Sequence, residues 1–441
     1  MVQPTDAEVK GEAGLVRGIR RWDLVAVAIN GIIGAGIFGL PSEVFRLIGG
    51  WSVVAFAACA LVVTLIILCF AEVGSRFSGT GGPYLYAREA FGPVVGFEVG
   101  WLMWLARLTA FAANCNLLVK YLGYFWPDAT TNAWRAVVIA TVVAGLTAVN
   151  IIGVRDAAIL SNLFTVGKLI PILLFVSVGL FFITPQNFSF AASPGYGDFS
   201  RSVLLLIYAF TGFEMAVIPA GEVRDPRRNL PLALLTAICI VAVLYILIQI
   251  VCIGTLPELA SSERPLADAG SRFLGSAGAA VISAGVLISI IGNLNVLILA
   301  GSRLPFAMAE RGELPERVSA THSRFRTPYV AIAATAAVML ALTLWSSFTS
   351  QVTISAIARL LAYAATCAAL VILRRKSSAP PALFKTPAGV AVAVVALALA
   401  IWLLSNSRLA EARDSAIAAG IGLAIFLAYR FKRRRSAPGA H

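Results

Sequence analysis

Residues 22–44 read WDLVAVAINGIIGAGIFGLPSEV, and this stretch decides how the sequence is interpreted. It is apolar and long enough to cross the roughly 30 Å hydrocarbon core of a bilayer, which takes about 20 residues of helix. Gly31, Gly34 and Gly36 fall near its middle, where each glycine weakens a helix by about 1 kcal/mol relative to alanine. The stretch therefore predicts a membrane-spanning helix that is interrupted at its centre.

Apolar stretches of similar length recur along the whole chain. The sequence is 59% hydrophobic and 13% charged, with a mean hydropathy of +0.86, which is far more apolar than a soluble domain of this length. Runs such as LVVTLIILCF at residues 61–70 do not alternate apolar with polar residues, so strands of a membrane barrel are excluded. We expect an all-α integral membrane protein with twelve spans, at residues 22–46, 51–73, 92–119, 136–153, 157–183, 202–221, 231–254, 277–301, 328–345, 350–373, 388–405 and 415–430.

The distribution of basic residues indicates the orientation of the chain. With the N-terminus in the cytoplasm, 24 of the 35 Lys and Arg fall in the tails and inner loops, 8 in outer segments and 3 within the spans. This excess follows the positive-inside rule, so the net charge of +13 reports topology and no nucleic-acid partner is expected. We predict a multi-pass protein of the cell (inner) membrane, surrounded by lipid, with both termini in the cytoplasm.

A second span is also expected to be interrupted. Residues 204–223 read LLLIYAFTGFEMAVIPAGEV, with Thr211 and Gly212 near the centre and Pro219 further on. Two interrupted helices five spans apart are typical of an inverted repeat whose substrate site lies between the breaks. Glycines in membrane helices can instead serve close helix packing. The neighbouring Glu214 favours the functional interpretation, because lipid does not tolerate an isolated acid.

Four ordered motifs resemble the amino acid, polyamine and organocation (APC) superfamily of transporters. NGIIGAGIF at residues 30–38 is similar to the family's unwound glycine motif, and AFTGFEMAVIPAGEVRDPRRNLPLAL at residues 209–234 is similar to its second unwound segment. GGPYLYAREAFGP at residues 81–93 resembles the family's inner loop before span 3. Residues 302–332, SRLPFAMAERGELPERVSATHSRFRTPYVAI, resemble the segment after span 8. The resemblance covers nearly the whole chain.

The resemblance implies a five-plus-five inverted repeat with discontinuous helices 1 and 6, plus two C-terminal helices. The expected parts are a cytoplasmic tail at 1–21, a first repeat at 22–183, a second repeat at 202–373, helices 11 and 12 at 388–430 and a basic cytoplasmic tail at 431–441. The implied function is secondary active transport of amino acids or related amines by alternating access. An exchanger without net proton coupling and a non-transporting sensor remain alternatives, and oligomeric state, substrate and flux direction stay open. The acid, histidine or metal constellation that a membrane-embedded enzyme needs is missing.

The resemblance also implies a substrate site at the two breaks. The free amides around Gly34, Ala35 and Gly36 would hold a substrate carboxylate at a helix N-terminus. Carbonyls of residues 208–211 would take its ammonium group, and Tyr208 stands where the family tends to place an aromatic that closes over the substrate. The candidate substrate-binding residues are Ile33, Gly34, Ala35, Gly36, Ile37, Arg107, Tyr208, Thr211, Gly212, Phe213 and Glu214.

Lys168 is the candidate for proton coupling. It matches a lysine that some proton-coupled members of the family place where sodium-coupled relatives hold their ion, so the proton is the only coupling ion expected. Burial disfavours the charged form of a lysine, which would let the side chain load and release a proton. The alternative is a fixed structural cation bonded to carbonyls of span 1. The six cysteines show no metal-ligand spacing, so no metal or other cofactor is expected.

Two arginines within the predicted spans need partners, since such a charge costs about 2.5–3.5 kcal/mol at mid-bilayer. Arg107 shares a helical face with Ala110 and Asn114, which the family turns toward the pocket. It is expected to pair with Glu214 or, alternatively, to bind an extra anionic group on the substrate. Arg359 is expected to lie near a span end and to snorkel to the interface.

Overall fold

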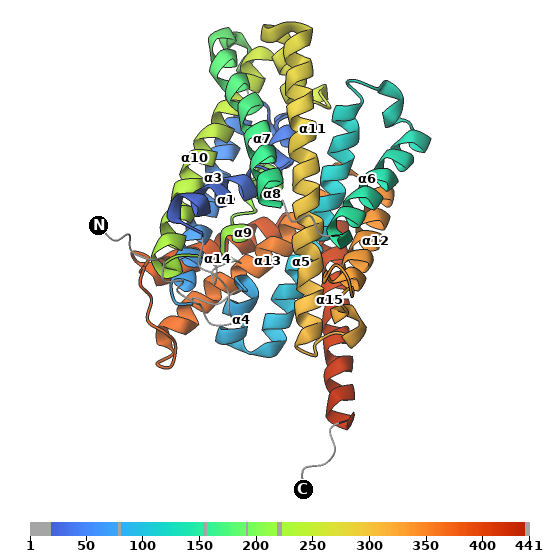
Figure 1. Cartoon of the computed structure of the whole chain (residues 1–441). Coiled ribbons are helices and arrows are strands. Elements are labelled where there is room, and N and C mark those ends of the chain that lie inside the picture. Colours follow the sequence, from blue (N-terminus) through green and yellow to red (C-terminus); the bar gives the residue numbers. More distant parts are fainter. Residues whose placement is uncertain (1–18, 78–80, 153–156, 191–192, 218–222, 437–441) are drawn as a thin grey trace, which may run out of the picture.

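The chain forms a bundle of helices joined by turns and loops (Figure 1). The computed structural model describes residues 19–77, 81–152, 157–190, 193–217 and 223–436. Within these ranges the only extended pairing is an isolated parallel bridge between Ile19 and Val223. The predicted all-α class is therefore confirmed for the described residues.

Eight of the described helical segments are long and apolar enough to cross a membrane, judged by length and composition. They cover Gly36–Gly74, Pro93–Leu122, Asn132–Ile152, Tyr196–Val217, Pro226–Thr255, Pro265–Glu310, Phe348–Arg375 and Leu409–Phe431. Three shorter apolar helices cover Gly167–Phe182, Tyr329–Trp345 and Gly389–Ser405. These segments define a multi-pass membrane protein.

The α-helices follow one another with few long connections. They are α1 (Arg21–Ile32), α2 (Gly36–Ile48), α3 (Ser52–Gly74), α4 (Pro83–Phe91), α5 (Pro93–Leu122), α6 (Asn132–Ile152), α7 (Ala157–Gly179), α8 (Tyr196–Phe210), α9 (Glu214–Val217), α10 (Pro226–Thr255), α11 (Pro265–Glu310), α12 (Tyr329–Trp345), α13 (Phe348–Arg375), α14 (Gly389–Ser405) and α15 (Leu409–Ser436). Helix α11 bends at Gly275, whose φ of 66° suits a residue without a Cβ atom.

Several helices differ from the expected spans. The span expected at 277–301 is the central part of α11, which continues from 265 to 310 because a helix does not end where its apolar segment ends. The segment at 81–93 contains helix α4. Residue 153, Pro219 and the outer parts of both expected tails lie outside the described residues.

The first expected span consists of two helices. Helix α1 ends at Ile32 and α2 begins at Gly36. Between them, Ile33 has φ −71° and ψ 83°, outside the helical range. The Gly34 amide then donates to the Ile32 carbonyl at 2.8 Å, which closes a tight turn. The chain therefore leaves the helix inside the glycine-rich motif.

A second interruption separates α8 from α9. Helix α8 ends at Phe210, and Thr211 is extended, with φ −86° and ψ 168°. Gly212 follows with φ 108°, a conformation that glycine adopts without the strain of a side chain. Helix α9 then begins at Glu214. The Thr-Gly pair thus marks the position where the backbone turns out of the helix.

The two interruptions touch each other at a pair of glycines. A Cβ atom on Gly31 would lie 2.5 Å from the carbonyl oxygen of Gly212, and one on Gly212 would lie 2.1 Å from the carbonyl oxygen of Gly31. Neither distance is compatible with a side chain. Glycine at both positions therefore allows the two backbones to meet.

Tyr245 of α10 stabilises both interruptions. Its hydroxyl lies 3.0 Å from the carbonyl oxygen of Ile32 and 3.3 Å from that of Ala209. These carbonyls stand at the ends of α1 and α8, where a helix leaves its last carbonyls without partners. Because an unsatisfied backbone group costs several kcal/mol away from water, this hydroxyl offsets part of the cost of each break.

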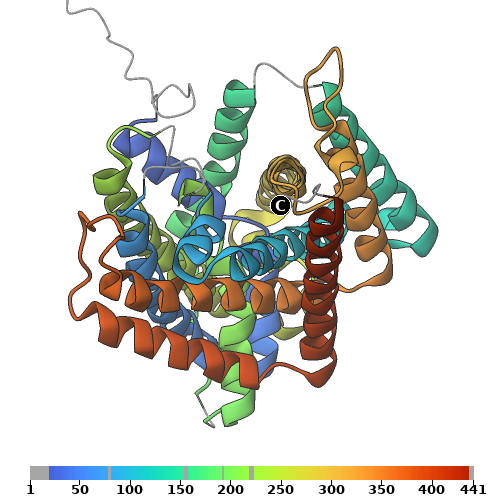
Figure 2. The ribbon, with the colours of Figure 1, turned by 90° about the horizontal axis from the view of Figure 1, so that it is seen from below.

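Long helices surround the paired interruptions. Helices α11 and α13 both pack against α5, while α2 packs against α8 and α1 against α10. Figure 2 shows α13 and α14 side by side, with α11 seen along its axis. The broken segments are therefore held inside a frame of continuous helices.

We predict that Gly212→Ala destabilises the fold by roughly 3 kcal/mol, from overpacking together with backbone strain at positive φ. The expected result is a fall of several degrees in the apparent melting temperature of the purified protein in detergent. Gly145→Ala on α6 is the control, because a Cβ atom there meets no atom within 4 Å. Equal melting temperatures for the two variants would contradict the close approach of the two breaks.

Candidate functional site

A cavity of about 30 Å³ lies where the two interruptions meet. Its walls come from both breaks and from α5, α11 and α13, and consist of Gly31, Ile32, Gly34, Ala35, Gly36, Ala110, Asn114, Tyr208, Thr211, Gly212, Met215, Asn293, Leu297 and Arg359. A water molecule needs roughly 10–15 Å³ of such space, so there is room for one or two waters. A larger ligand requires the surrounding segments to move apart.

The cavity brings together about half of the residues expected at the site. Six of them line it: Gly34, Ala35, Gly36, Tyr208, Thr211 and Gly212. Five others stand outside the lining: Ile33, Ile37, Arg107, Phe213 and Glu214. All five are buried, the three apolar ones in the hydrophobic core. The cavity lining therefore contains six of the eleven predicted residues, and a role of the other five in substrate binding stays a prediction.

The side chain of Tyr208 is held in place by two polar groups of α5, one of which also contacts α11. Its hydroxyl accepts a hydrogen bond from Asn114 Nδ2 at 2.8 Å and lies 3.4 Å from the carbonyl oxygen of Ala110. Asn114 Oδ1 in turn accepts from Asn293 Nδ2 of α11 at 3.3 Å. A Cβ atom on Gly34 would lie 2.7 Å from that same Asn293 nitrogen. Hydrogen bonds thus lead from Tyr208 through Asn114 to Asn293, which lies close to Gly34 of the first break.

The backbone groups of the two breaks are not equally free. Helix α2 begins at Gly36, and the first amides of a helix have no partner within it. In the second break, the Tyr208 carbonyl already accepts the Thr211 hydroxyl at 2.8 Å, and the Ala209 carbonyl accepts from Tyr245. The first break therefore offers hydrogen-bond donors, whereas two of the carbonyls expected to hold an ammonium group are occupied.

Glu214 pairs with Arg359 and not with Arg107, contrary to the preferred sequence interpretation. The carboxylate is completely buried and lies 2.9 Å from Arg359 Nη1 of α13. It also accepts from the Tyr363 hydroxyl at 2.8 Å and from the Gly212 amide at 2.9 Å. These contacts occupy both carboxylate oxygens and tie the second break to α13.

The expectation that Arg359 snorkels to the interface is wrong. Only 4% of Arg359 is exposed, and the residue lies well inside α13, eleven residues after its start at Phe348. Tyr363 follows Arg359 by four positions, so both side chains project from one face of the helix. That face meets Glu214. The charge of Arg359 is visible in the sequence, but its contact with Glu214 depends on how α13 packs against the second break.

Arg107 is buried and makes no ion pair with any described residue, although the charge of Glu214 reaches it. Only 1% of it is exposed, and its one described hydrogen bond is a long contact of 3.4 Å from Nη1 to the carbonyl oxygen of Met103. Its Nε atom has no hydrogen-bond partner among the described residues. Arg107 stands one helical turn before Ala110, which lines the cavity. Its charge therefore lies close behind the cavity wall.

Lys168 of α7 reaches the first break. Its Nζ atom donates to the carbonyl oxygen of Asn30 at 2.7 Å and to that of Ile33 at 2.8 Å, and the residue is 5% exposed. Both carbonyls belong to the last turn of α1 and the residue that follows it. The ammonium group thus supplies donors where the interrupted helix supplies none.

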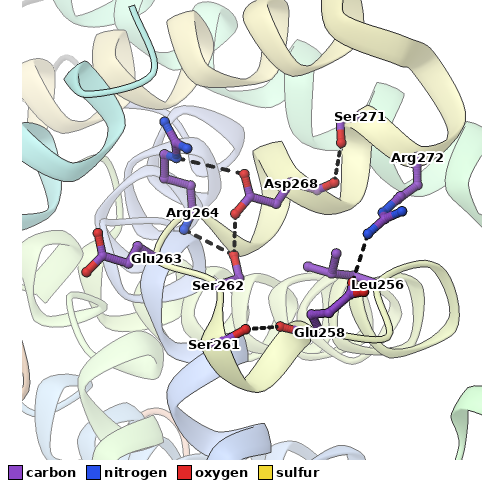
Figure 3. Close-up of a pocket in the computed structure, with 9 residues that line it drawn as sticks. All are labelled: Leu256, Glu258, Ser261, Ser262, Glu263, Arg264, Asp268, Ser271 and Arg272. Atoms are coloured by element: carbon purple, nitrogen blue, oxygen red, sulfur yellow. Dashed lines mark hydrogen bonds and ion pairs between the residues drawn. The ribbon is translucent and has the colours of Figure 1, made fainter. Parts of the chain in front are cut away.

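A larger cavity of about 650 Å³ lies at the connection between α10 and α11 (Figure 3). Its charged side chains bond to one another: Arg272 lies 2.8 Å from Glu258, and Arg264 lies 3.8 Å from Asp268. No residue of either break lines it. The smaller cavity, which both breaks line, is therefore the better candidate for the ligand site.

Sequence reasoning missed three polar residues that shape the site: Asn293, Tyr245 and Tyr363. Each lies in a mainly apolar segment that carries a few polar side chains. Polar residues at such depth usually face the interior of a bundle, so they could have been identified as candidates. Their partners could not, because these depend on how the helices pack.

The interrupted helices lie within an apolar bundle and line one small cavity, an arrangement typical of membrane transport proteins. Residues 19–426 match the model of the amino acid permease family. The chain therefore belongs to this family of transporters, which are not enzymes.

Curated relatives match over nearly their full length. The chain is 29% identical to the serine/threonine exchanger SteT of Bacillus subtilis, with 98% of this chain and 99% of the relative covered. It is 25% identical to the branched-chain amino acid permease BcaP of the same organism, with 98% and 97% covered. It is 26% identical to a methylthioribose transporter of that organism, with 88% of each chain covered. These relatives support the predicted membership of the APC superfamily.

A double-mutant cycle tests the pairing at the second break. We predict that Glu214→Gln and Arg359→Gln each destabilise the protein by about 3 kcal/mol, since each leaves a buried charge without its partner. The double variant should lose clearly less than the sum. Unfolding in mixed detergent micelles measures the three free energies.

The same cycle with Arg107→Gln is the matched comparison. Because Glu214 has its close contacts with Arg359, we expect a coupling energy with Arg107 that is at least 1 kcal/mol smaller. A coupling to Arg107 as large as that to Arg359 would contradict the described pair.

Proposed function

We propose that the protein is a secondary active transporter of amino acids or related amines that works by alternating access. The observation that carries this proposal is the small polar cavity enclosed by the two interrupted helices. Broken helices in a bilayer are tolerated where they line a site, and their half-helix ends supply charge to a bound zwitterion. The amides at the start of α2 would hold the carboxylate of the substrate.

The proposed topology has twelve crossings arranged as two inverted repeats of five, followed by two further helices. It counts α1 with α2, and α8 with α9, as one interrupted crossing each. Helix α4 is too short to cross. The excess of Lys and Arg in the inner segments supports cytoplasmic termini in the cell membrane.

Tyr208 is proposed as the lid of the site. Its ring lines the cavity and its hydroxyl is bonded to Asn114, so the lid is shut over a space too small for a substrate. Entry of a substrate requires this hydrogen bond to break. Asn114 also bonds to Asn293, which lies close to Gly34, so loss of the Tyr208 bond would affect the surroundings of the first break.

Lys168 is proposed to couple transport to protons. Its two hydrogen bonds to the carbonyls of Asn30 and Ile33 are charge-assisted, and such bonds are about twice as strong as neutral ones. Loss of the proton would weaken the hold on the end of α1 and free the first break to move. The alternative, a permanently charged structural lysine, predicts transport that does not respond to a proton gradient.

Exchange without net proton movement is the second candidate. It is favoured by the similarity to a relative named as a serine/threonine exchanger. The two candidates differ in what the opposite compartment must contain, because an exchanger needs a counter-substrate whereas a symporter needs a proton gradient.

Transport is tested with the full chain reconstituted in proteoliposomes and a panel of radiolabelled L-amino acids. We expect saturable counterflow of at least one of them, and accumulation when the outside is made more acidic than the inside. Counterflow without gradient-driven accumulation would favour the exchanger. Empty liposomes are the control, and no counterflow of any amino acid or amine would rule the proposal out.

Lys168→Ala should abolish accumulation driven by a pH gradient while part of the counterflow remains. The reason is that the variant lacks the protonatable group but keeps the lining of the cavity. Lys120→Ala is the matched control, because Lys120 lies near the end of α5 and pairs with Glu263. Accumulation by Lys168→Ala at the wild-type level would remove this lysine from the coupling mechanism.

A further inference from the structure

The charged side chains around the cavity are unequal in number. Among the described residues, one acid, Glu214, faces three bases at or directly behind the cavity: Arg107, Lys168 and Arg359. The contacts of Glu214 are complete, and its close ionic partner is Arg359. A surplus of positive charge therefore remains whether or not Lys168 carries its proton.

Arg107 is the source of this surplus. The next acid toward the start of α5, Glu98, is nine residues away, which is about 13 Å along a helix. This separation is too long for an ion pair. The Glu214 carboxylate is committed to Arg359, so Arg107 is buried with a long hydrogen bond to Met103 as its described contact.

Two guanidinium groups also have hydrogen-bond donors without acceptors. Arg359 lines the cavity, and its Nε atom is buried with no partner among the described residues. The same is true of Arg107 Nε. A guanidinium carries five N–H donors and no acceptor, so the group that satisfies it must supply lone pairs, and a carboxylate does so in a matching planar geometry.

A neutral amino acid would not balance these charges. Its own carboxylate and ammonium groups cancel, and the start of α2 already provides amides for the carboxylate. A cationic amino acid would add a like charge, which disfavours binding. A second carboxylate on the substrate would meet both the surplus charge and the free donors.

We propose that the site selects amino acids with an acidic side chain, with Arg359 as the contact of the side-chain carboxylate and Arg107 as the charge that supports it. This inference rests on the proposed function and names its substrate class. Arg107 of α5 and Arg359 of α13 would then determine specificity for the side chain, while the two breaks bind the α-carboxylate and α-ammonium groups common to all amino acids.

The experiment compares substrates that differ in charge and hardly in shape. Proteoliposomes containing the full chain are assayed with L-aspartate against L-asparagine, L-glutamate against L-glutamine, and L-lysine. We expect half-maximal uptake of each acid at a concentration at least tenfold below that of its amide, and no uptake of lysine.

Arg107→Gln should reduce this acid-to-amide ratio to about one. Arg107→Lys, which keeps the charge, should retain most of the preference. Arg303→Gln is the control, because Arg303 is an exposed arginine of α11 outside the cavity lining. If Arg107→Gln does not fold, the wild-type ratio and Arg107→Lys still decide the outcome.

The possible failures are distinguishable. Uptake of amides that equals or exceeds uptake of the acids overturns this inference and leaves the proposed transport function standing. An unchanged ratio in a folded Arg107→Gln variant overturns the role of Arg107. Absence of transport for every amino acid tested removes the proposed function and the inference together.

Discussion

A backbone that leaves its helix inside an apolar bundle must find other partners for its amides and carbonyls, and this constraint governs the centre of the molecule. At the first break the Lys168 ammonium takes two carbonyls, and at both breaks the Tyr245 hydroxyl takes one more. The Glu214 carboxylate receives the Gly212 amide. Side chains from α7 and α10 thus replace hydrogen bonds that the interrupted helices cannot make for themselves.

The side chains that stabilise the breaks also place charges next to the cavity. Glu214 stabilises the second break, but its burial needs a cation, and Arg359 supplies it from α13. Among the described residues, Arg107 then shares the charge of Glu214 with Arg359 and forms no ion pair itself. The ion pair that stabilises the second break therefore also determines which charges lie next to the cavity, so the stability of the fold and the proposed selection of the ligand depend on the same residues.

The sequence predicted the helical class and the positions of the two interruptions, because apolar length and glycine position are local signals. The contact of Lys168 with the first break is seen in the structure, whereas its role in proton coupling stays a prediction. It did not predict the partner of Glu214. Arg107 and Arg359 are both arginines within predicted spans, so the sequence does not show which of them pairs with Glu214. That depends on how α5 and α13 are rotated about their axes. The same limit applies to Asn293 and Tyr245, whose polar groups are visible in the sequence but whose targets lie on other helices.

The position of Tyr245 has a mechanical consequence. A phenol has one hydrogen, so it cannot fully serve two carbonyl oxygens at the same time. The Ile32 oxygen, at 3.0 Å, is closer than the Ala209 oxygen, at 3.3 Å. A small rotation of either half-helix would change which of the two carbonyl oxygens accepts the hydrogen bond from the Tyr245 hydroxyl. Because one hydroxyl contacts the ends of both α1 and α8, a movement of one interrupted helix would change the hydrogen bonding of the other.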